Sequence, residues 1–250
     1  MGLKVQNVTK KFDDFVAIED ISFEVTDGEF VCLLGPSGCG KSTLLRLIAG
    51  LDKPSGGEIF LDGERIKGTG ADRGFVFQEY ALFPWRTVRR NIEFGLEIRK
   101  IAKEERRRVS QKYINLVNLA GFENYRPRKL SAGMKQRVAI ARALANDPKI
   151  LLMDEPFGSL DAQTRNMMQE ELLEVWSGTK KTVLFVTHSV DEAVFLADRI
   201  IVLSSSPGRV IEICNVKIGR PRSRTSAEAS GIRDYILGLL AAEINKIRKI

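Results

Sequence analysis

The eight residues from Gly35 to Ser42 constrain the fold more than any other stretch of this chain. They read Gly-Pro-Ser-Gly-Cys-Gly-Lys-Ser and match the pattern G-x-x-x-x-G-K-[ST] of a phosphate-binding loop. An apolar run of strand length, residues 29–34, precedes them, and residues 43–50 follow as a helix that glycine closes. This order lets backbone N–H groups converge on an anion at the positive end of a helix. The stretch therefore predicts a nucleotide-phosphate site, with a glycine-rich turn and an exposed lysine as the alternative.

The side chains in this loop suggest separate tasks. Lys41 is placed to reach the β- and γ-phosphates as a point charge, and the Ser42 hydroxyl is placed to hold Mg²⁺. The thiol of Cys39 lies among the loop amides, where a helix N-terminus lowers a thiol pKa. We therefore expect Cys39 to be the most readily alkylated of the three cysteines, and Mg-ATP to protect it.

Polar side chains end three other predicted strands. Gln78 ends the strand 74–78, where its amide could reach Mg²⁺ or an attacking water. The apolar run 150–153 ends in Asp154, suited to Mg²⁺ through water, and Glu155, suited to accept a proton from a hydrolytic water. Two carboxylates at the end of a buried strand are costly unless a cation lies nearby.

The strand 182–187 ends at His188, the only histidine of the chain. Lone histidines are usually bystanders, but a strand end is where α/β folds bind ligands. We therefore expect His188 to hydrogen-bond a γ-phosphate.

Residues 130–145 predict a second anion site. Ser131 and Gly133 open an alanine-rich helix that stops near Pro148, and the amide and dipole logic of the first loop applies again. An ordinary serine cap is the alternative. Phe12, 23 residues before the phosphate loop and expected in the loop after the first strand, could stack on a purine. A core role for Phe12 and stacking by Phe15 are the competing readings.

Chain length, cysteine spacing and charge limit the remaining possibilities for the fold. A chain of 250 residues suits one large α/β domain, or one with an insertion, and the helical pattern of residues 88–121 is that insertion. No apolar run approaches the roughly 18 residues needed to cross a bilayer, and the N-terminus lacks the apolar core of a signal peptide. Three widely spaced cysteines indicate reduced thiols. The net charge of +7 gathers in residues 85–112 and from residue 217 onward, as either a solvated face or a surface for anionic lipid.

Taken in order, these motifs resemble the ATP-binding cassette (ABC) ATPases. The resemblance rests on residues 35–42, Gln78, residues 130–134, residues 150–155 and His188, together with the sequence Ser159-Leu160-Asp161. It narrows to importers of the nitrate, sulfonate and taurine type through the segments 82–85, 91–93 and 207–209. The usual signature Leu-Ser-Gly-Gly-Gln departs here to Leu-Ser-Ala-Gly-Met.

The resemblance implies a P-loop α/β fold with a mixed, mainly parallel sheet, an N-terminal antiparallel β part and an inserted helical subdomain. Residues 1–222 would form the cassette, with the helical subdomain at about 86–146, and residues 223–250 a C-terminal linker and helix, the helix running from Asp234 to Ile250. Catalysis would involve Glu155 as the general base, His188 and Gln78, and Mg²⁺ would be held by Ser42, Gln78 and Asp154. The residues implied to bind ATP are Phe12, Gly35, Pro36, Ser37, Gly38, Cys39, Gly40, Lys41, Ser42, Thr43, Ser131, Ala132, Gly133 and Asp161.

The same resemblance implies partners. The signature at Ser131 of one copy would close the site of another in a head-to-tail homodimer. Transmembrane permease subunits would dock on Phe83-Pro84-Trp85, with a solute-binding protein beyond them, at the cytoplasmic face of the cell membrane. Nucleic acid is not expected, although a soluble ABC ATPase acting on nucleic acid or ribosomes is the alternative that the positive charge keeps open. A small-molecule kinase ranks behind both, since Ser131 and His188 would have no evident role in it.

Overall fold

The computed structural model describes residues 2–247, which form two compact units. Of the described residues, 2–69 and 182–247 belong to the first unit, and residues 70–181 form the second. The elements of the first unit are β1 (Gly2–Phe12), β2 (Phe15–Thr26), β3 (Phe30–Leu34), α1 (Lys41–Ala49), β4 (Gly56–Leu61), β5 (Glu64–Arg65), β8 (Thr182–Thr187), α6 (Val190–Leu196), β9 (Arg199–Leu203), β10 (Val210–Asn215) and α7 (Ala227–Ile247). Those of the second unit are β6 (Arg73–Val76), α2 (Val88–Ile98), α3 (Lys103–Leu116), the 3₁₀ turn η1 (Pro127–Lys129), α4 (Ala132–Leu144), β7 (Ile150–Asp154) and α5 (Ala162–Thr179).

Strand β3 lies inside a parallel group in the first unit. It pairs in parallel with β8 on one side and β9 on the other, and β10 runs antiparallel along β9. Every residue of β3 and β8 is buried, which explains why both sequences are continuous apolar runs rather than alternating ones. In the second unit β6 and β7 pair in parallel. The predicted fold class, a mixed and mainly parallel α/β core, is confirmed.

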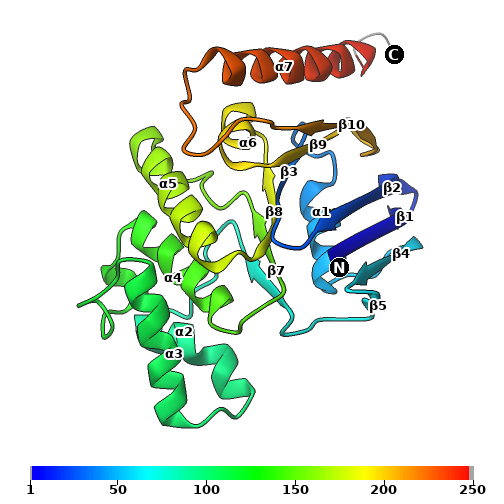
Figure 1. Ribbon diagram of the computed structural model, residues 1–250. Helices are drawn as coiled ribbons and strands as arrows, with labels where there is room; N and C mark the ends of the chain where they lie inside the picture. The colour runs from blue at the N-terminus through cyan, green and yellow to red at the C-terminus, as the bar shows by residue number, and fades with distance from the viewer. Residues whose placement is uncertain (1, 248–250) are drawn as a thin grey trace. The chain divides into compact units, whose positions relative to one another are not determined.

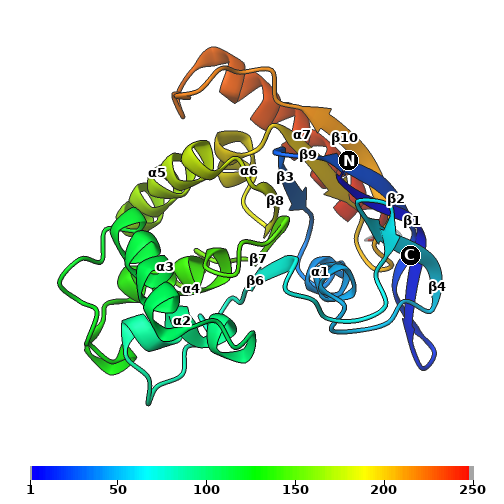
Figure 2. The same cartoon turned by 60° about the horizontal axis from the view of Figure 1, so that its bottom comes forward.

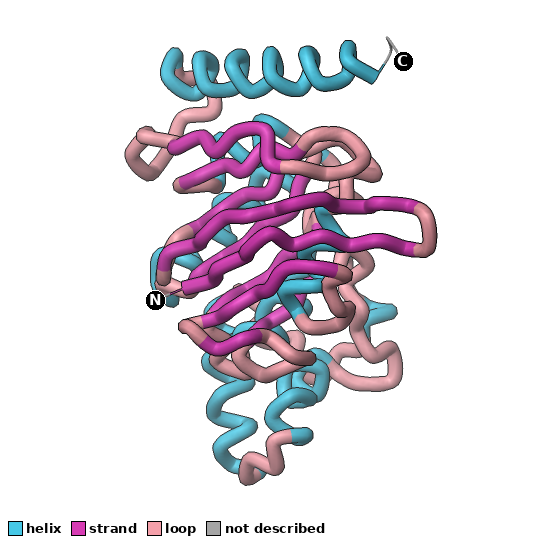
Figure 3. Tube along the Cα trace, turned by 90° about the vertical axis from the view of Figure 1, so that its right-hand side faces the viewer, coloured by secondary structure: helices cyan, strands magenta, loops and turns pink. Residues whose placement is uncertain are grey.

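An antiparallel sheet forms the N-terminal part of the first unit. Strand β1 pairs with β2 through a hairpin and with β4 on its other edge, and β5 extends β4. Figure 3 shows the β1 and β2 strands as the longest pair in this sheet. Helix α1 lies between this sheet and β3, as the end-on view in Figure 2 shows. The helix that opens with Lys41 is thus packed on both sides.

Three sequence-based boundaries are wrong. Strand β6 ends at Val76, so Gln78 lies two residues beyond the strand rather than at its end. Helix α7 begins at Ala227 rather than at Asp234, because Ser226 accepts a hydrogen bond from the Ala229 N–H and starts the helix inside a segment expected to be irregular. Phe12 is the last residue of strand β1, not part of a loop after it. Residues 248–250, expected at the end of the C-terminal helix, lie outside the described residues. Among residues 2–247, none of the helices is both long and apolar enough to cross a bilayer.

Candidate functional site

The loop before α1 is built to receive an anion. The helix begins at Lys41 after Gly40, whose φ of 88° only glycine adopts readily, and no side chain caps the first turn. A Cβ on Gly40 would lie 2.3 Å from the Cγ2 of Ile18, so this position has no room for a larger residue. The Lys41 ammonium donates to the carbonyl oxygens of Gly35 and Pro36, each at 2.8 Å, and the side chain is only 4% exposed. The loop therefore fits a phosphate in shape and in charge.

His188 lies at the strand end next to this loop. In the parallel register Leu34 of β3 is opposite Thr187 of β8, so Gly35 and His188 each follow the end of neighbouring strands. His188 is exposed, and the Ser189 N–H donates to the Thr187 Oγ1 at 2.9 Å, which fixes the backbone on either side of it. The sequence-based placement of His188 next to the phosphate loop agrees with this arrangement.

Phe12 occupies the end of the β1–β2 hairpin. Phe12 is 47% exposed, and the Lys10 ammonium lies 4.9 Å from the centroid of its ring. Lys10 pairs with Ile18, the residue that contacts Gly40 of the phosphate loop. The exposed ring is thus available for stacking rather than part of the core, although Phe15 beside it is exposed as well.

Cys39 differs from its sequence-based prediction. Burial raises the pKa of its thiol and outweighs the lowering effect of Lys41, and only 1% of Cys39 is exposed. The expectation that Cys39 is the most readily alkylated cysteine is therefore wrong. Cys32 is buried too, whereas Cys214 on the edge strand β10 is partly exposed.

In the second unit, the predicted polar residues Gln78, Asp154 and Glu155 lie at or just beyond the ends of two neighbouring strands. Val76 of β6 pairs with Met153 of β7, so Gln78 follows one strand end while Asp154 and Glu155 lie at the end of the other. A Cβ built on Gly158 would lie 3.9 Å from both the Gln78 Nε2 and the Glu155 Oε2. The amide and the carboxylate therefore flank the same glycine.

The backbone around these side chains is unusual. Glu155 has a φ of 41°, and Tyr80 and Ala81, just after Gln78, have φ values of 60° and 46°. Non-glycine residues in this region store strain, which is common at functional sites. Arg142 of α4 holds the two strained residues by donating to the Tyr80 carbonyl at 2.8 Å and to the Ala81 carbonyl. No sequence pattern indicates this role of Arg142, because its carbonyl partners lie about sixty positions away.

The two helix starts with residues predicted to bind ATP, Ser131 and Asp161, are neighbours. Ser131 caps α4 by accepting from the Met134 N–H, and Asp161 caps α5 by accepting from the Thr164 N–H at 3.0 Å. That hydrogen bond lowers the pKa of the Asp161 carboxyl. A Cβ on Gly133 would lie 3.4 Å from the Thr164 Cγ2, so the two first turns are neighbours. Ser131 and Ala132 are exposed, and Ser131 is thus an ordinary cap that also faces solvent.

An aromatic segment precedes α2. Trp85 is 69% exposed, and its ring centroid is 5.6 Å from that of Phe83, which packs against Phe94 at 4.4 Å. The buried Asn91 fixes the segment: its side chain accepts from the Phe83 N–H and donates to the carbonyls of Phe83, Arg86 and Thr87. Trp85 is therefore presented to solvent by a rigid support rather than by a loose loop.

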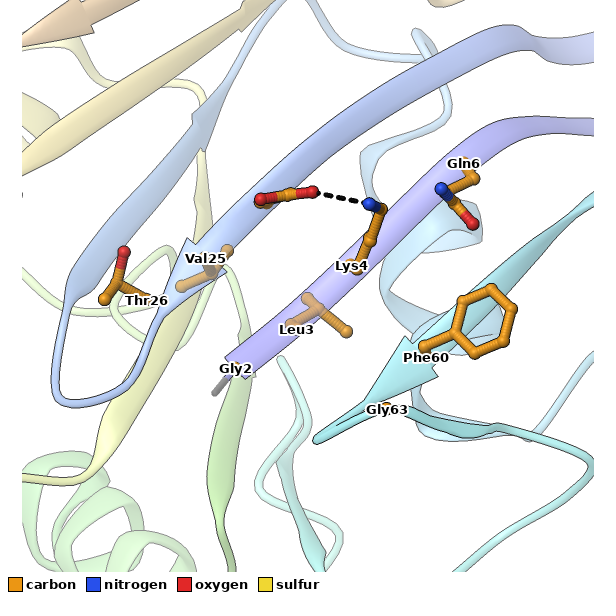
Figure 4. A pocket seen from close by; sticks show the side chains of 9 residues that line it. Gly2, Leu3, Lys4, Gln6, Val25, Thr26, Phe60 and Gly63 are labelled. Carbon is orange, nitrogen blue, oxygen red and sulfur yellow. Dashed lines mark ion pairs between the residues drawn. The ribbon is translucent and has the colours of Figure 1, made fainter.

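A cavity of about 540 Å³ lies on the antiparallel sheet, away from every predicted site residue of the first unit. Figure 4 shows Lys4, Gln6 and Phe60 around it, and the Lys4 ammonium pairs with Glu24 at 2.9 Å. Its lysine is neutralised by that glutamate, so nothing in this cavity favours a phosphate.

The parallel strands, the loop before α1 and its buried lysine define a P-loop nucleotide-binding protein. Comparison with known families makes this more specific. The ABC transporter family model matches residues 18–158, and the chain belongs to this family. It is accordingly an ATP-binding cassette and an ATPase.

Individual relatives align over most of their length. An uncharacterized ABC transporter ATP-binding protein of Methanocaldococcus jannaschii is 56% identical over 99% of this chain and 94% of its own. A nitrate import ATP-binding protein of Synechocystis is 52% identical over 84% of this chain and 80% of its own. An aliphatic sulfonates import ATP-binding protein of Bacillus cereus is 46% identical over 95% of both chains. A solved dimeric ATP-binding cassette in a post-hydrolysis state, bound to ADP and Pi, superposes with a TM-score of 0.75 at 35% identity, covering 87% of this chain and 100% of that one.

The turn between β9 and β10 supports the phosphate loop, a contact that sequence reasoning missed. Gly208 donates to the Ala17 carbonyl at 3.0 Å and accepts from the Glu19 N–H at 2.9 Å, so β2 holds it in place. A Cβ on Gly208 would lie 2.1 Å from the Cys39 carbonyl oxygen. Since Gly208 cannot retreat, Cys39 and the loop around it would have to move.

Replacing Gly208 with alanine should therefore weaken ATP binding by about tenfold, because overpacking of this kind costs roughly 1–3 kcal/mol. Titration with a fluorescent ATP analogue measures the affinity, and thermal unfolding follows the fold. Gly219→Ala is the matched control, since a Cβ there meets nothing within 4 Å. Equal affinities for the two variants would show that the turn does not set the loop geometry.

Proposed function

We propose that this protein is the ATP-hydrolysing, energy-coupling subunit of an importer for a small solute of the nitrate, sulfonate or taurine type. The observation that carries the proposal is the 46–52% identity, over most of the chain, to proteins named for the import of nitrate, aliphatic sulfonates and taurine. Within that range the relatives differ in solute, so the solute class is proposed only at this breadth.

Nucleotide binding is assigned to the first unit, with Phe12 stacking on the adenine and residues 35–43 holding the phosphates. The cradle of loop amides and the buried Lys41 support this assignment. Mg²⁺ would be held by Ser42, Gln78 and Asp154, whose hydroxyl, amide and carboxylate oxygens are ligands that this ion prefers. When bound, the ion would neutralise charge on the phosphates.

Hydrolysis is assigned to three side chains. Glu155 accepts a proton from the attacking water, Gln78 orients that water, and His188 donates a hydrogen bond to the γ-phosphate. The shared position of Glu155 and Gln78 around Gly158 supports the first two roles, and the strand register supports the third.

The signature residues act on a second copy. Ser131, Ala132, Gly133 and Asp161 of one subunit would close the nucleotide site of the other in a head-to-tail homodimer, giving two equivalent sites. The exposure of Ser131, Ala132 and Asp161 at two adjacent helix starts supports this role, as does the dimer formed by the related cassette. ATP binding would close the dimer, and hydrolysis would reopen it to drive the permease.

Transmembrane permease subunits are the proposed membrane partners, with a solute-binding protein acting through them, and the cassette would be peripheral on the cytoplasmic face. The permease would dock on the helical subdomain, residues 86–146, at the preceding segment Phe83-Pro84-Trp85. A large aromatic side chain held rigidly in solvent is typical of a protein interface.

Replacing Trp85 with alanine should weaken permease binding at least tenfold while ATP turnover of the isolated subunit stays within about twofold, since anchoring aromatic residues contribute roughly 2 kcal/mol or more. Pull-down of the purified subunit with detergent-extracted permease, followed by vesicle transport, measures the effect. Ile98→Ala is the control, because it removes another exposed apolar side chain from the same unit. Salt-sensitive retention of RNA or DNA in place of a permease would contradict the proposed function.

A further inference from the structure

Two arginines that follow β10 cover the C-terminal end of helix α6. Arg222 donates to the carbonyls of Val194, Phe195 and Ala197 at 2.9, 3.1 and 2.6 Å, and Arg220 donates to the Leu196 carbonyl at 2.6 Å. These are four consecutive carbonyls at the end of a helix, which otherwise lack partners within the helix. Two cations at this end also match the negative pole of the helix dipole.

Arg222 is buried to a degree that is rare for arginine, with 8% of it exposed. Burial, together with the nearby Arg220, lowers the pKa of Arg222 to about 10, so it remains charged at neutral pH. A buried guanidinium is tolerated only with several hydrogen-bond acceptors. Here the end of α6 supplies three of them, and the Ile218 and Val216 carbonyls accept two further hydrogen bonds from the same guanidinium.

The opposite end of α6 is joined directly to His188. Ser189 caps the helix by accepting from the Glu192 N–H, and its own N–H is held by Thr187. The helix has only seven residues, or roughly 10 Å, so its two ends move together. Any rotation of α6 would therefore displace His188.

The rest of the C-terminal segment reinforces the same helix. The Arg224 guanidinium lies 3.5 Å from the centroid of the Phe195 ring, and Arg233 of α7 is 3.5 Å from the Asp191 carboxylate in the first turn of α6. Figure 1 shows α7 running beside α6 after the connection from β10. The segment from Arg220 to Arg233 thus contacts both ends of the helix that follows His188.

We propose that Arg222, supported by Arg220, is a positioning residue for His188: by fixing the C-terminal end of α6 it holds the imidazole where the γ-phosphate will lie. The proposal rests on the proposed function, since it assigns His188 to ATP hydrolysis. It gives the C-terminal segment a part in the reaction, although none of its residues is among those assigned to the nucleotide. Misplacement of a catalytic group by about 1 Å can lower a rate by up to about a hundredfold.

The single histidine makes a direct test possible. The full chain, purified without a histidine tag, has one imidazole, so His188 gives one pair of imidazole ring signals in a carbon-detected or nitrogen-detected NMR spectrum. We expect Arg222→Gln to shift or broaden these signals and Arg222→Lys, which keeps a charged donor, to restore them in part. Val5→Ala, a cavity substitution at a buried residue of strand β1, should lower stability without moving them.

Kinetics supply the second measurement. Arg222→Gln should lower kcat for ATP about tenfold with KM changed less than twofold, because the phosphate loop is untouched. Unchanged His188 signals, or an equal loss of kcat in Val5→Ala, would overturn the proposal. If Arg222→Gln does not fold, Arg220→Gln takes its place under the same criteria. A wild-type protein without ATP turnover would instead refute the proposed function, and the NMR comparison would still decide whether Arg222 positions His188.

Discussion

Replacing Glu155 with glutamine is expected to reduce ATP turnover by about 100-fold or more, since a general base contributes roughly 10²- to 10⁴-fold. Glutamine has the same shape but cannot accept the proton of an attacking water. ATP affinity should stay within about twofold, because the loop amides and Lys41 are unchanged. The substitution also preserves the side-chain volume at a residue whose φ is 41°, so it removes the base without disturbing this strained turn.

Phosphate release at saturating ATP measures turnover, and equilibrium binding of a fluorescent ATP analogue measures affinity. Glu174→Gln makes the same chemical change at an exposed position of α5 and should leave both values unchanged. Turnover within twofold of the wild-type rate would exclude Glu155 as the base. A loss explained by weaker binding alone would assign Glu155 to nucleotide binding instead.

The strands that precede the predicted site residues could be predicted because the pattern that marks them is local. Residues 30–34, 150–153 and 182–187 are continuous apolar runs, and such runs suit strands covered on both faces. The polar residues that directly follow these runs were then predicted to lie at the strand ends. Ser131 was predictable for the same reason, since a cap needs only its own helix.

Hydrogen bonds between residues far apart in the sequence could not be predicted in this way. Arg142 holds the carbonyls of Tyr80 and Ala81, and Arg222 holds the end of α6, through contacts with backbone oxygens that every residue possesses. No residue type marks the acceptor, so no sequence pattern reveals the pair. Gly208 entered the sequence analysis only within the segment 207–209 of the importer resemblance, because its packing against Cys39 depends on the fold.

Cys39 shows how two local rules compete. The helix N-terminus and Lys41 both lower the pKa of its thiol, and the sequence displays both of them. Burial acts in the opposite direction and is larger, but it depends on the fold, which brings Leu203 of β9 to the same side of Gly35 as the Cys39 sulfur. The sequence-based prediction therefore had the wrong direction for the pKa shift of Cys39, because burial cannot be read from neighbouring residues in the sequence.

Mixing two inactive variants should restore ATP turnover if each site is shared between copies. Lys41→Ala removes the phosphate contact, and Ser131→Arg places a large side chain at the exposed start of α4. Each variant alone should retain at most a few per cent of the wild-type turnover, because losing a preorganised charge contact costs about 10²-fold or more.

In a mixed dimer the intact loop of the Ser131→Arg copy faces the intact signature of the Lys41→Ala copy, while the other site carries both defects. Random pairing at equal concentrations makes half of the dimers mixed, each with one working site, so turnover should approach about a quarter of the wild-type value if the sites act independently. Phosphate release measured across mixing ratios should then pass through a maximum near equal amounts, and sedimentation velocity should show dimers that require ATP. A mixture whose turnover is the weighted mean of its components at every ratio would mean that one copy hydrolyses ATP alone, and the exposed starts of α4 and α5 would then need a different role.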